Sequence, residues 1–89
     1  MIRHIVLIKN GQRAMPILKE LAYFCGQFEG VTAFRWGENM SIEPDVRHGF
    51  DLAFEIDFHS KADRDRYVED SEHQKIGARL ARIFHEGPP

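Results

Sequence analysis

Tyr67 and His73 are the side chains in this sequence whose types and spacing best suit chemistry. An imidazole, with an unperturbed pKa of about 6.5, can accept a proton at neutral pH. A tyrosine hydroxyl can hold or protonate an enolate-like oxygen. The sequence therefore offers His73 as a candidate catalytic base and Tyr67 as a candidate acid, with His4 as a third, tentative catalytic residue.

These two side chains meet only if the helix that carries them is broken. On a continuous helix, a spacing of six residues turns them about 240° apart at ~3.6 residues per turn. Asp70-Ser71 is typical of a break, because Ser71 can cap a second helix with Gln74 in the reciprocal position. Both side chains can then point between sheet and helices, where His4 can reach them. The alternative is structural: His73 donates a hydrogen bond to the backbone and closes the break.

Cofactor and metal chemistry have little support in the sequence. No Gly-rich phosphate loop is present, and no spacing of His, Asp and Glu predicts a metal site. Cys25 falls on an apolar helical stripe, where we expect an inert core thiol. We therefore expect neither a cofactor nor a metal ion.

The composition indicates one small domain, residues 1–89. Lys and Arg total 12 against 14 Asp and Glu, a formal charge of −2, which does not favour nucleic-acid binding. No apolar run approaches the ~20 residues of a membrane helix, and a single cysteine fits a reducing compartment, so we expect a cytoplasmic protein. So small a domain buries a modest share of its surface, and pairing with a second copy would stabilise it.

The hydrophobic pattern predicts a βαββα order. Residues 2–9 form a strand with apolar side chains on both faces, so we expect both faces to be covered. A helix follows, with Pro16 in its first turn, an apolar stripe from Leu18 to Phe28 and a stop at Gly30. Residues 31–37 form the second strand.

In the second half of the chain, a polar loop at residues 38–48 is followed by another strand and another helix. In residues 49–58, large apolar side chains alternate strictly with mostly acidic ones, which predicts a half-buried strand. Ser60 caps the broken last helix, supported by Asp63. The apolar face of its second piece comprises His73, Ile76, Gly77, Leu80 and Phe84.

This order predicts an α+β fold with an antiparallel sheet and helices on one face. The greasy face of the third strand lies under the helices. A small apolar ligand could bind there, in a pocket lined by Val6, Leu52, Phe54 and Leu80.

The opposite sheet face carries Ile5, Leu7 and Ala53 among charged residues. A semi-apolar, charge-mixed face suits a second sheet, so we expect a homodimer through these three residues. The charges could pair within or across that interface, or could be solvated. They are Arg3, Lys9, Glu55 and Asp57.

Three motifs together resemble the stress-responsive α/β-barrel (Dabb) family. The first is Ile2-Arg3-His4-Ile5-Val6-Leu7. The second runs from Gly30-Val31 through Phe34-Arg35-Trp36-Gly37-Glu38-Asn39 to Ser41 and Glu43. The third comprises Gly49-Phe50, Ile56-Asp57-Phe58, Ala62, Arg64-Asp65-Arg66-Tyr67 and His73.

The resemblance implies a ferredoxin-like monomer whose sheet packs on a second sheet, giving a dimeric α/β barrel that contributes to stress tolerance. The family is similar to olivetolic acid cyclase, a plant polyketide cyclase whose Tyr and His match Tyr67 and His73. A first-strand His of that enzyme matches His4, but its third-strand pocket His matches Leu52, which argues against the same reaction.

Family members also continue past the second helix with an apolar strand beside the first strand. Here the sequence reads Glu86-Gly87-Pro88-Pro89 at that point, so we expect the usual last strand to be absent, either because the protein naturally lacks it or because this form is truncated. The first strand is then expected to have an open edge, which a partner chain or the C-terminal tail would cover.

Two classes of function remain open. One is a dimeric module that binds a small apolar ligand or acts structurally. The other is a cofactor-free enzyme, polyketide cyclase-like or, by fold analogy alone, monooxygenase-like, with His73 as base and Tyr67 as acid. An open cavity that contains both side chains would favour the enzyme, whereas bulky Phe50, Leu52 and Phe54 filling that space would exclude it.

Overall fold

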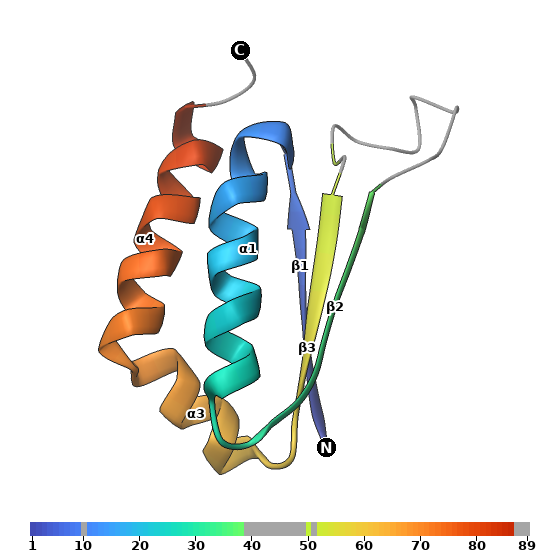
Figure 1. Cartoon of the computed structure of the whole chain (residues 1–89), viewed down its shortest axis with the longest axis vertical. Coiled ribbons are helices and arrows are strands. Elements are labelled where there is room, and N and C mark those ends of the chain that lie inside the picture. Colours follow the sequence, from blue (N-terminus) through green and yellow to red (C-terminus); the bar gives the residue numbers. More distant parts are fainter. Residues whose placement is uncertain (10, 39–49, 51, 87–89) are drawn as a thin grey trace.

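The computed structural model describes residues 1–9, 11–38, 50 and 52–86. The elements in chain order are β1 (Ile2–Ile8), α1 (Gly11–Gln27), β2 (Val31–Glu38), β3 (Leu52–Phe58), α3 (Lys61–Glu69) and α4 (Ser71–Glu86). They form two layers, with the helices on one face of the sheet (Figure 1). This is the α+β, ferredoxin-like arrangement that the sequence predicts.

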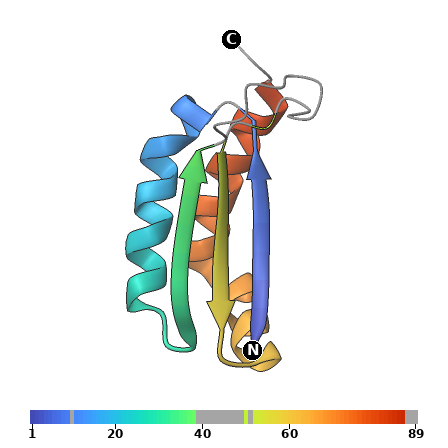
Figure 2. The same ribbon diagram turned by 90° about the vertical axis from the view of Figure 1, so that its right-hand side faces the viewer.

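The sheet of the described residues has the order β1-β3-β2, and both strand pairs are antiparallel. Ile5 and Arg35 both lie opposite Glu55, one on each side of the central strand. Figure 2 looks straight at the sheet with the helices behind it. β3 is central because it pairs with β1 along one edge and with β2 along the other, and its side chains alternate between the covered face and the open face.

The hydrophobic core lies between β3 and the helices. Leu52, Phe54, Ile56 and Phe58 are all buried on this face, which confirms the predicted greasy face. The helices cover it with buried side chains from α1 and α4, among them Leu18, Leu21, Cys25, Ile76, Leu80 and Ile83.

The start of the first helix differs from the prediction. α1 begins at Gly11, so Pro16 lies inside the helix instead of in its first turn. Proline removes the hydrogen bond to the carbonyl four residues earlier, here that of Gln12. Pro16 and Gln12 are both exposed, so water can satisfy that carbonyl, while buried Ala14, Ile17 and Leu18 hold the helix on the sheet.

The end of this helix was predicted correctly. α1 ends at Gln27, and Gly30 has φ of +100°, a conformation that side-chain-bearing residues rarely adopt. A Cβ at Gly30 would also lie 2.5 Å from the Asp63 side chain. The turn therefore needs glycine for its backbone conformation and to let α3 approach closely.

The second half needs two corrections. β3 begins at Leu52, and Phe50 lies outside the strand, whereas Gly49 and most of the predicted loop lie outside the described residues. The predicted helix break is present, but Asp70 caps α4 in place of Ser71: its Oδ1 accepts from the backbone N–H of Glu72 at 2.8 Å and of His73 at 3.1 Å. A carboxylate caps well because it also complements the positive end of the helix.

Candidate functional site

Tyr67 lies inside the core, on the helix-covered side of the sheet. Its side chain is only 2% exposed. Its ring packs against Phe58, Phe28 and Phe24, at centroid distances of 5.0, 5.9 and 6.2 Å. An aromatic cluster of this kind contributes stability beyond the area that it buries.

The Tyr67 hydroxyl interacts with the thiol of Cys25 in this core. Burial raises the pKa of Tyr67 far above its usual value, and the neighbouring Cys25 raises it further. Burial likewise raises the pKa of Cys25 to about 12, although its hydrogen bond with Tyr67 works the other way. Both groups stay protonated at neutral pH, so this thiol is unreactive, as we expected for a core cysteine.

His73 lies directly against Tyr67, with ring centroids 3.9 Å apart. Its Nδ1 is buried and has no hydrogen-bond partner among the described residues. Burial lowers the pKa of His73, nearby His4 lowers it further, and the backbone carbonyl of Val68 and the Asp70 carboxylate oppose the shift. The ring is therefore neutral at pH 7.

Asp70 is a positioning residue that the sequence placed at the break, although the predicted cap was Ser71. It ends α3 by donating its backbone N–H to the carbonyl of Tyr67 at 3.2 Å, and it caps α4 through its side chain. This change of direction turns Tyr67 and His73 toward each other. The pair is thus brought together by the break, as the spacing required.

His4 reaches the same region from β1, but it opens toward the surface. It is half-buried, and burial followed by the charge of Arg64 lowers its pKa. It borders a shallow hollow of about 320 Å³ whose other residues are Arg64, Asp65, Val68 and Glu69.

The predicted pocket residues lie on the covered face. Leu52, Phe54 and Leu80 are buried in the core, and Val6 packs against it partly buried. The four hollows that described residues line do not include Tyr67 or His73 among their lining residues. This placement favours the structural alternative for the pair, and their catalytic roles stay a prediction. No group of three or more His, Cys, Asp and Glu side chains within the described residues is arranged to hold a metal ion.

The open face of the sheet is the other candidate site. Ile5 is 61% and Leu7 is 53% exposed on this face, beside half-buried Ala53. Exposed large apolar side chains that adjoin one another are typical of an interaction surface.

An ion-pair network lies beside these apolar residues, and we call it the arginine–acid network. Arg3 Nε donates to Asp57 Oδ1 at 2.8 Å, and Arg35 Nη2 donates to Asp57 Oδ2 at 2.6 Å. Arg35 Nε also donates to Glu55 Oε1 at 2.7 Å. Asp57 is only 6% exposed although no helix covers it, because the two arginines do. Their hydrogen bonds, Arg3 first, lower the pKa of Asp57 to about 2.

Of the alternatives that the sequence left open for these charges, Arg3 and Asp57 take the pairing within the sheet. Arg35 was not expected in this network from the sequence. The signal was available, because a cation on one edge strand and two acids at alternate positions of the central strand meet on one face of a sheet.

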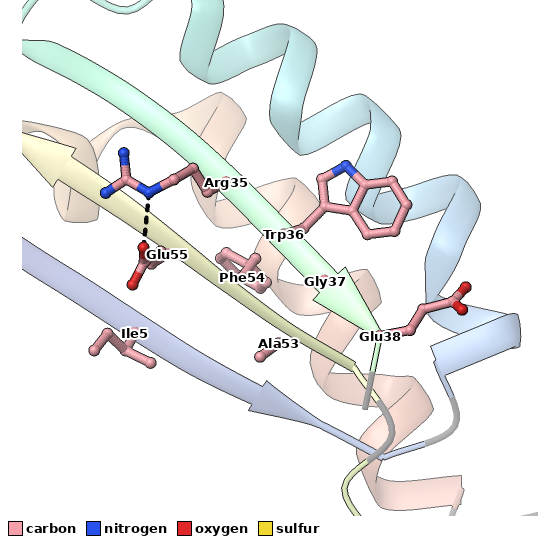
Figure 3. A pocket seen from close by; sticks show the side chains of 8 residues that line it. All are labelled: Ile5, Arg35, Trp36, Gly37, Glu38, Ala53, Phe54 and Glu55. Carbon is pink, nitrogen blue, oxygen red and sulfur yellow. Dashed lines mark hydrogen bonds and ion pairs between the residues drawn. The ribbon is translucent and has the colours of Figure 1, made fainter. Parts of the chain in front are cut away.

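A hollow of about 310 Å³ indents the open face where β2 and β3 carry their smallest side chains. Gly37 and Ala53 lie side by side there, with Ile5 on one flank and the Arg35–Glu55 ion pair on another (Figure 3). A Cβ added at Gly37 would meet nothing within 4 Å.

Comparison with known proteins places the chain in a family. The stress responsive A/B barrel domain (Dabb) family matches residues 2–86, so the chain belongs to that family. A curated relative, the stress-response A/B barrel domain-containing protein At5g22580 of Arabidopsis thaliana, is 33% identical over 73 residues. That match covers 80% of this chain and 63% of the relative, so the chain spans less than two thirds of that protein's length.

Solved structures support the same fold. The crystal structure of At3g17210 from Arabidopsis thaliana has a TM-score of 0.73 and 27% identity, covering 98% of this chain and 84% of that one. A dimeric ferredoxin-like protein of unknown function from Jannaschia sp. CCS1 has a TM-score of 0.65 and 30% identity, covering 88% and 80%. A hydroxynitrile lyase from Passiflora edulis, with a TM-score of 0.68 and 20% identity over 88% and 78%, shares the fold. No helix within the described ranges is long and apolar enough to cross a bilayer.

Proposed function

We propose that this chain is a homodimeric stress-responsive module, in which the open faces of two sheets pack together as an α/β barrel. The observation that carries this proposal is the exposure of Ile5 and Leu7 on the face that no helix covers. Burying apolar surface from water is the main driving force of protein association, at roughly 25 cal/mol per Å².

The charges of this face are compatible with burial between two sheets. The arginine–acid network holds two arginines and two acids, Arg3, Arg35, Glu55 and Asp57, so their formal charges cancel. Charges that are already paired and hydrogen-bonded cost less to desolvate than isolated ones. Sheets pack about 10 Å apart with side chains interdigitating, which suits a face of mixed large and small residues.

Two further observations support a dimer. The Jannaschia protein, 30% identical to this chain, is a dimeric ferredoxin-like protein. A domain of 89 residues also gains stability by covering an exposed sheet face. We place the dimer in the cytoplasm, where the lone cysteine, buried in the core, stays reduced.

The decisive measurement is the molar mass of wild type and a Leu7→Glu variant by size-exclusion chromatography with light scattering. We expect wild type to be a dimer at micromolar concentration and the variant a monomer, because the new carboxylate would be buried unpaired. Tyr23→Glu is the matched control: Tyr23 is an exposed aromatic on α1, outside the sheet, and this variant should stay dimeric.

A monomeric wild-type protein would refute the proposed homodimer. A dimer that survives Leu7→Glu but dissociates with Tyr23→Glu would move the interface to the helices. Circular dichroism checks that each variant is folded, so that loss of the dimer is not confused with unfolding.

As a second function we propose that the domain binds a small apolar ligand beside His4 and His73. The observation that favours it is the buried Nδ1 of His73, which has no partner among the described residues and could bond to a ligand's hydroxyl. His4, whose charge acts on His73, borders the surface hollow of about 320 Å³. Tyr67 would serve as packing, because its hydroxyl lies against Cys25.

Imidazole resonances in NMR spectra test this second function. With the apolar dye 8-anilinonaphthalene-1-sulfonate as the probe, signals of His4 and His73 should shift together, while exposed His59 serves as an internal control. A dye that shifts none of these signals, or shifts only His59, would count against a site in this place.

A further inference from the structure

On the open face, one row of side chains crosses all three strands, and the side chains become smaller from β1 through β3 to β2. Leu7 of β1 pairs with Ala53 of β3, and Ala53 pairs with Gly37 of β2. Side chains on the same face of paired positions are neighbours. The row therefore descends from leucine to alanine to glycine across the sheet, and we call it the Leu–Ala–Gly rung.

The low end of this rung is an actual depression. The 310 Å³ hollow and a second one of about 260 Å³ both border Gly37, Glu38 and Ala53. Leu7 borders the second hollow and stands at the high end of the rung. The face thus carries a knob and a hole at one level of the sheet.

Along the strands, the side chains of the open face change from charged at one end to apolar at the other. The rung that contains Arg3, Asp57 and Ala33 is the charged end, and the Leu–Ala–Gly rung is the apolar end. The rung between them holds Ile5, Glu55 and Arg35.

When the strands of two packed sheets are roughly aligned, a two-fold axis in the interface runs either across the strands or along them. An axis across the strands would place β1 over the partner's β1, with the apolar end of one copy on the charged end of the other. An axis along β3 would place β1 over the partner's β2 and keep every rung at its own level. Only the second choice sets knob against hole and apolar end against apolar end.

We propose that the dimer axis runs along β3, so that the Leu7 side chain of each copy fills the hollow over the partner's Gly37. This inference rests on the proposed homodimer and specifies its geometry. Symmetry makes the contact occur twice, because a two-fold interface uses the same patch on both copies. The acids of the central strand then lie near the axis, with arginines of both copies on either side of them.

Two variants alter the knob and the hole separately. Gly37→Leu fills the hole, and it should fold normally because φ at Gly37 is not positive and space is open around it. Leu7→Ala removes the knob from an exposed position. Each should weaken the homodimer roughly tenfold or more in Kd, the first by a clash and the second by a void.

Mixing the two variants gives the sharpest test. In a heterodimer of Gly37→Leu with Leu7→Ala, one contact is the original leucine over glycine. The other contact sets the shortened knob of one copy over the filled hole of its partner, so both contacts fit again. With one variant labelled with ¹⁵N, native mass spectrometry should show heterodimers above the share expected from random pairing. The double variant in a single chain should also regain the dimer affinity lost by the single ones.

The outcomes separate this geometry from the proposed function beneath it. A wild-type dimer whose affinity is unchanged by Gly37→Leu, or random pairing in the mixture, overturns the axis along β3 while the homodimer stands. A monomeric wild type overturns both. A preference for heterodimers supports both.

Discussion

The two faces of the sheet use the same strands in opposite ways. On the covered face, Ile56 is fully buried and lies among aromatic and aliphatic side chains. On the open face of the same strand, Asp57 is nearly as buried, but two arginines cover it. The helices cover one face within the monomer, whereas the other face shields its acid with paired charges and leaves Ile5 and Leu7 exposed.

This difference separates residues that hold the fold from residues that are available for function. Tyr67 and His73, the pair with the most suggestive chemistry, lie on the covered face, where Tyr67 is buried in the core and partly buried His73 packs against it. The face that is open to a partner carries residues without reactive side-chain groups, namely Ile5, Leu7 and Gly37. Suggestive residue types are therefore a weaker guide here than exposure is.

The largest expected effect comes from one substitution made on both faces. Ile56→Ala should lower the free energy of unfolding by about 2–5 kcal/mol, because it leaves a cavity in the core. Ile5→Ala removes the same atoms from an exposed site and should cost the isolated monomer only about 0.5 kcal/mol or less. Urea unfolding at several protein concentrations measures both losses, since the contribution of Ile5 to the proposed dimer should grow with concentration.

Equal losses for Ile5 and Ile56 at every concentration would show that the two faces are not distinct. A concentration-dependent loss confined to Ile56→Ala would show that the dimer interface lies on the covered face and not on the open face.

The second effect is the acid sensitivity of the open face. The pKa of Asp57 is lowered from 3.8 to about 2 in the folded protein, so its ionised form stabilises the fold. This contribution is complete above pH ~4, the unfolded value, and is lost as the pH falls through about 2. We expect unfolding midpoints of wild type to decline across this window, and those of Asp57→Asn to decline less.

Glu20→Gln is the matched control for that measurement. Glu20 pairs with Arg79 on the helical layer, and the hydrogen bond from Arg79 lowers its pKa, but its side chain is about half exposed. A solvated pair of this kind contributes little. An acid response that disappears in Glu20→Gln and persists in Asp57→Asn would refute the special role of the open face.

The smallest effect concerns what positions His73 on the covered face. Asp70→Ala should cost about 1 kcal/mol through the lost cap of α4. Ser71→Ala, at the neighbouring position, should cost clearly less because the structure assigns the cap to Asp70. Thermal unfolding measures both losses of stability. A larger loss for Ser71→Ala than for Asp70→Ala would show that Ser71 is the N-cap of α4.

Much of the architecture could be predicted from residue patterns. The alternation in β3, the apolar stripe of α1, the N-cap at Ser60 and the stop at Gly30 are local patterns, which backbone geometry converts directly into structure. Pro16 misled the prediction, because proline is also tolerated inside a helix where the freed carbonyl is exposed to water.

The candidate site was less predictable. The six-residue spacing correctly required a break between Tyr67 and His73, but no local pattern indicates whether two side chains meet in a cavity or in a core. That outcome depends on Phe24, Phe28 and Phe58, which arrive from α1, its following turn and β3.

By itself, the sequence determined which side chains share a face of each strand, because that follows from a period of two residues along one chain. It thereby placed Ile5, Leu7 and Ala53 together on the face opposite the core. Only the tertiary structure decided that Arg3 and Arg35 close on Asp57 from both sides, and that Leu7, Ala53 and Gly37 form one rung. These contacts depend on strand order and register, which arise from pairing between segments far apart in the chain and not from any single segment.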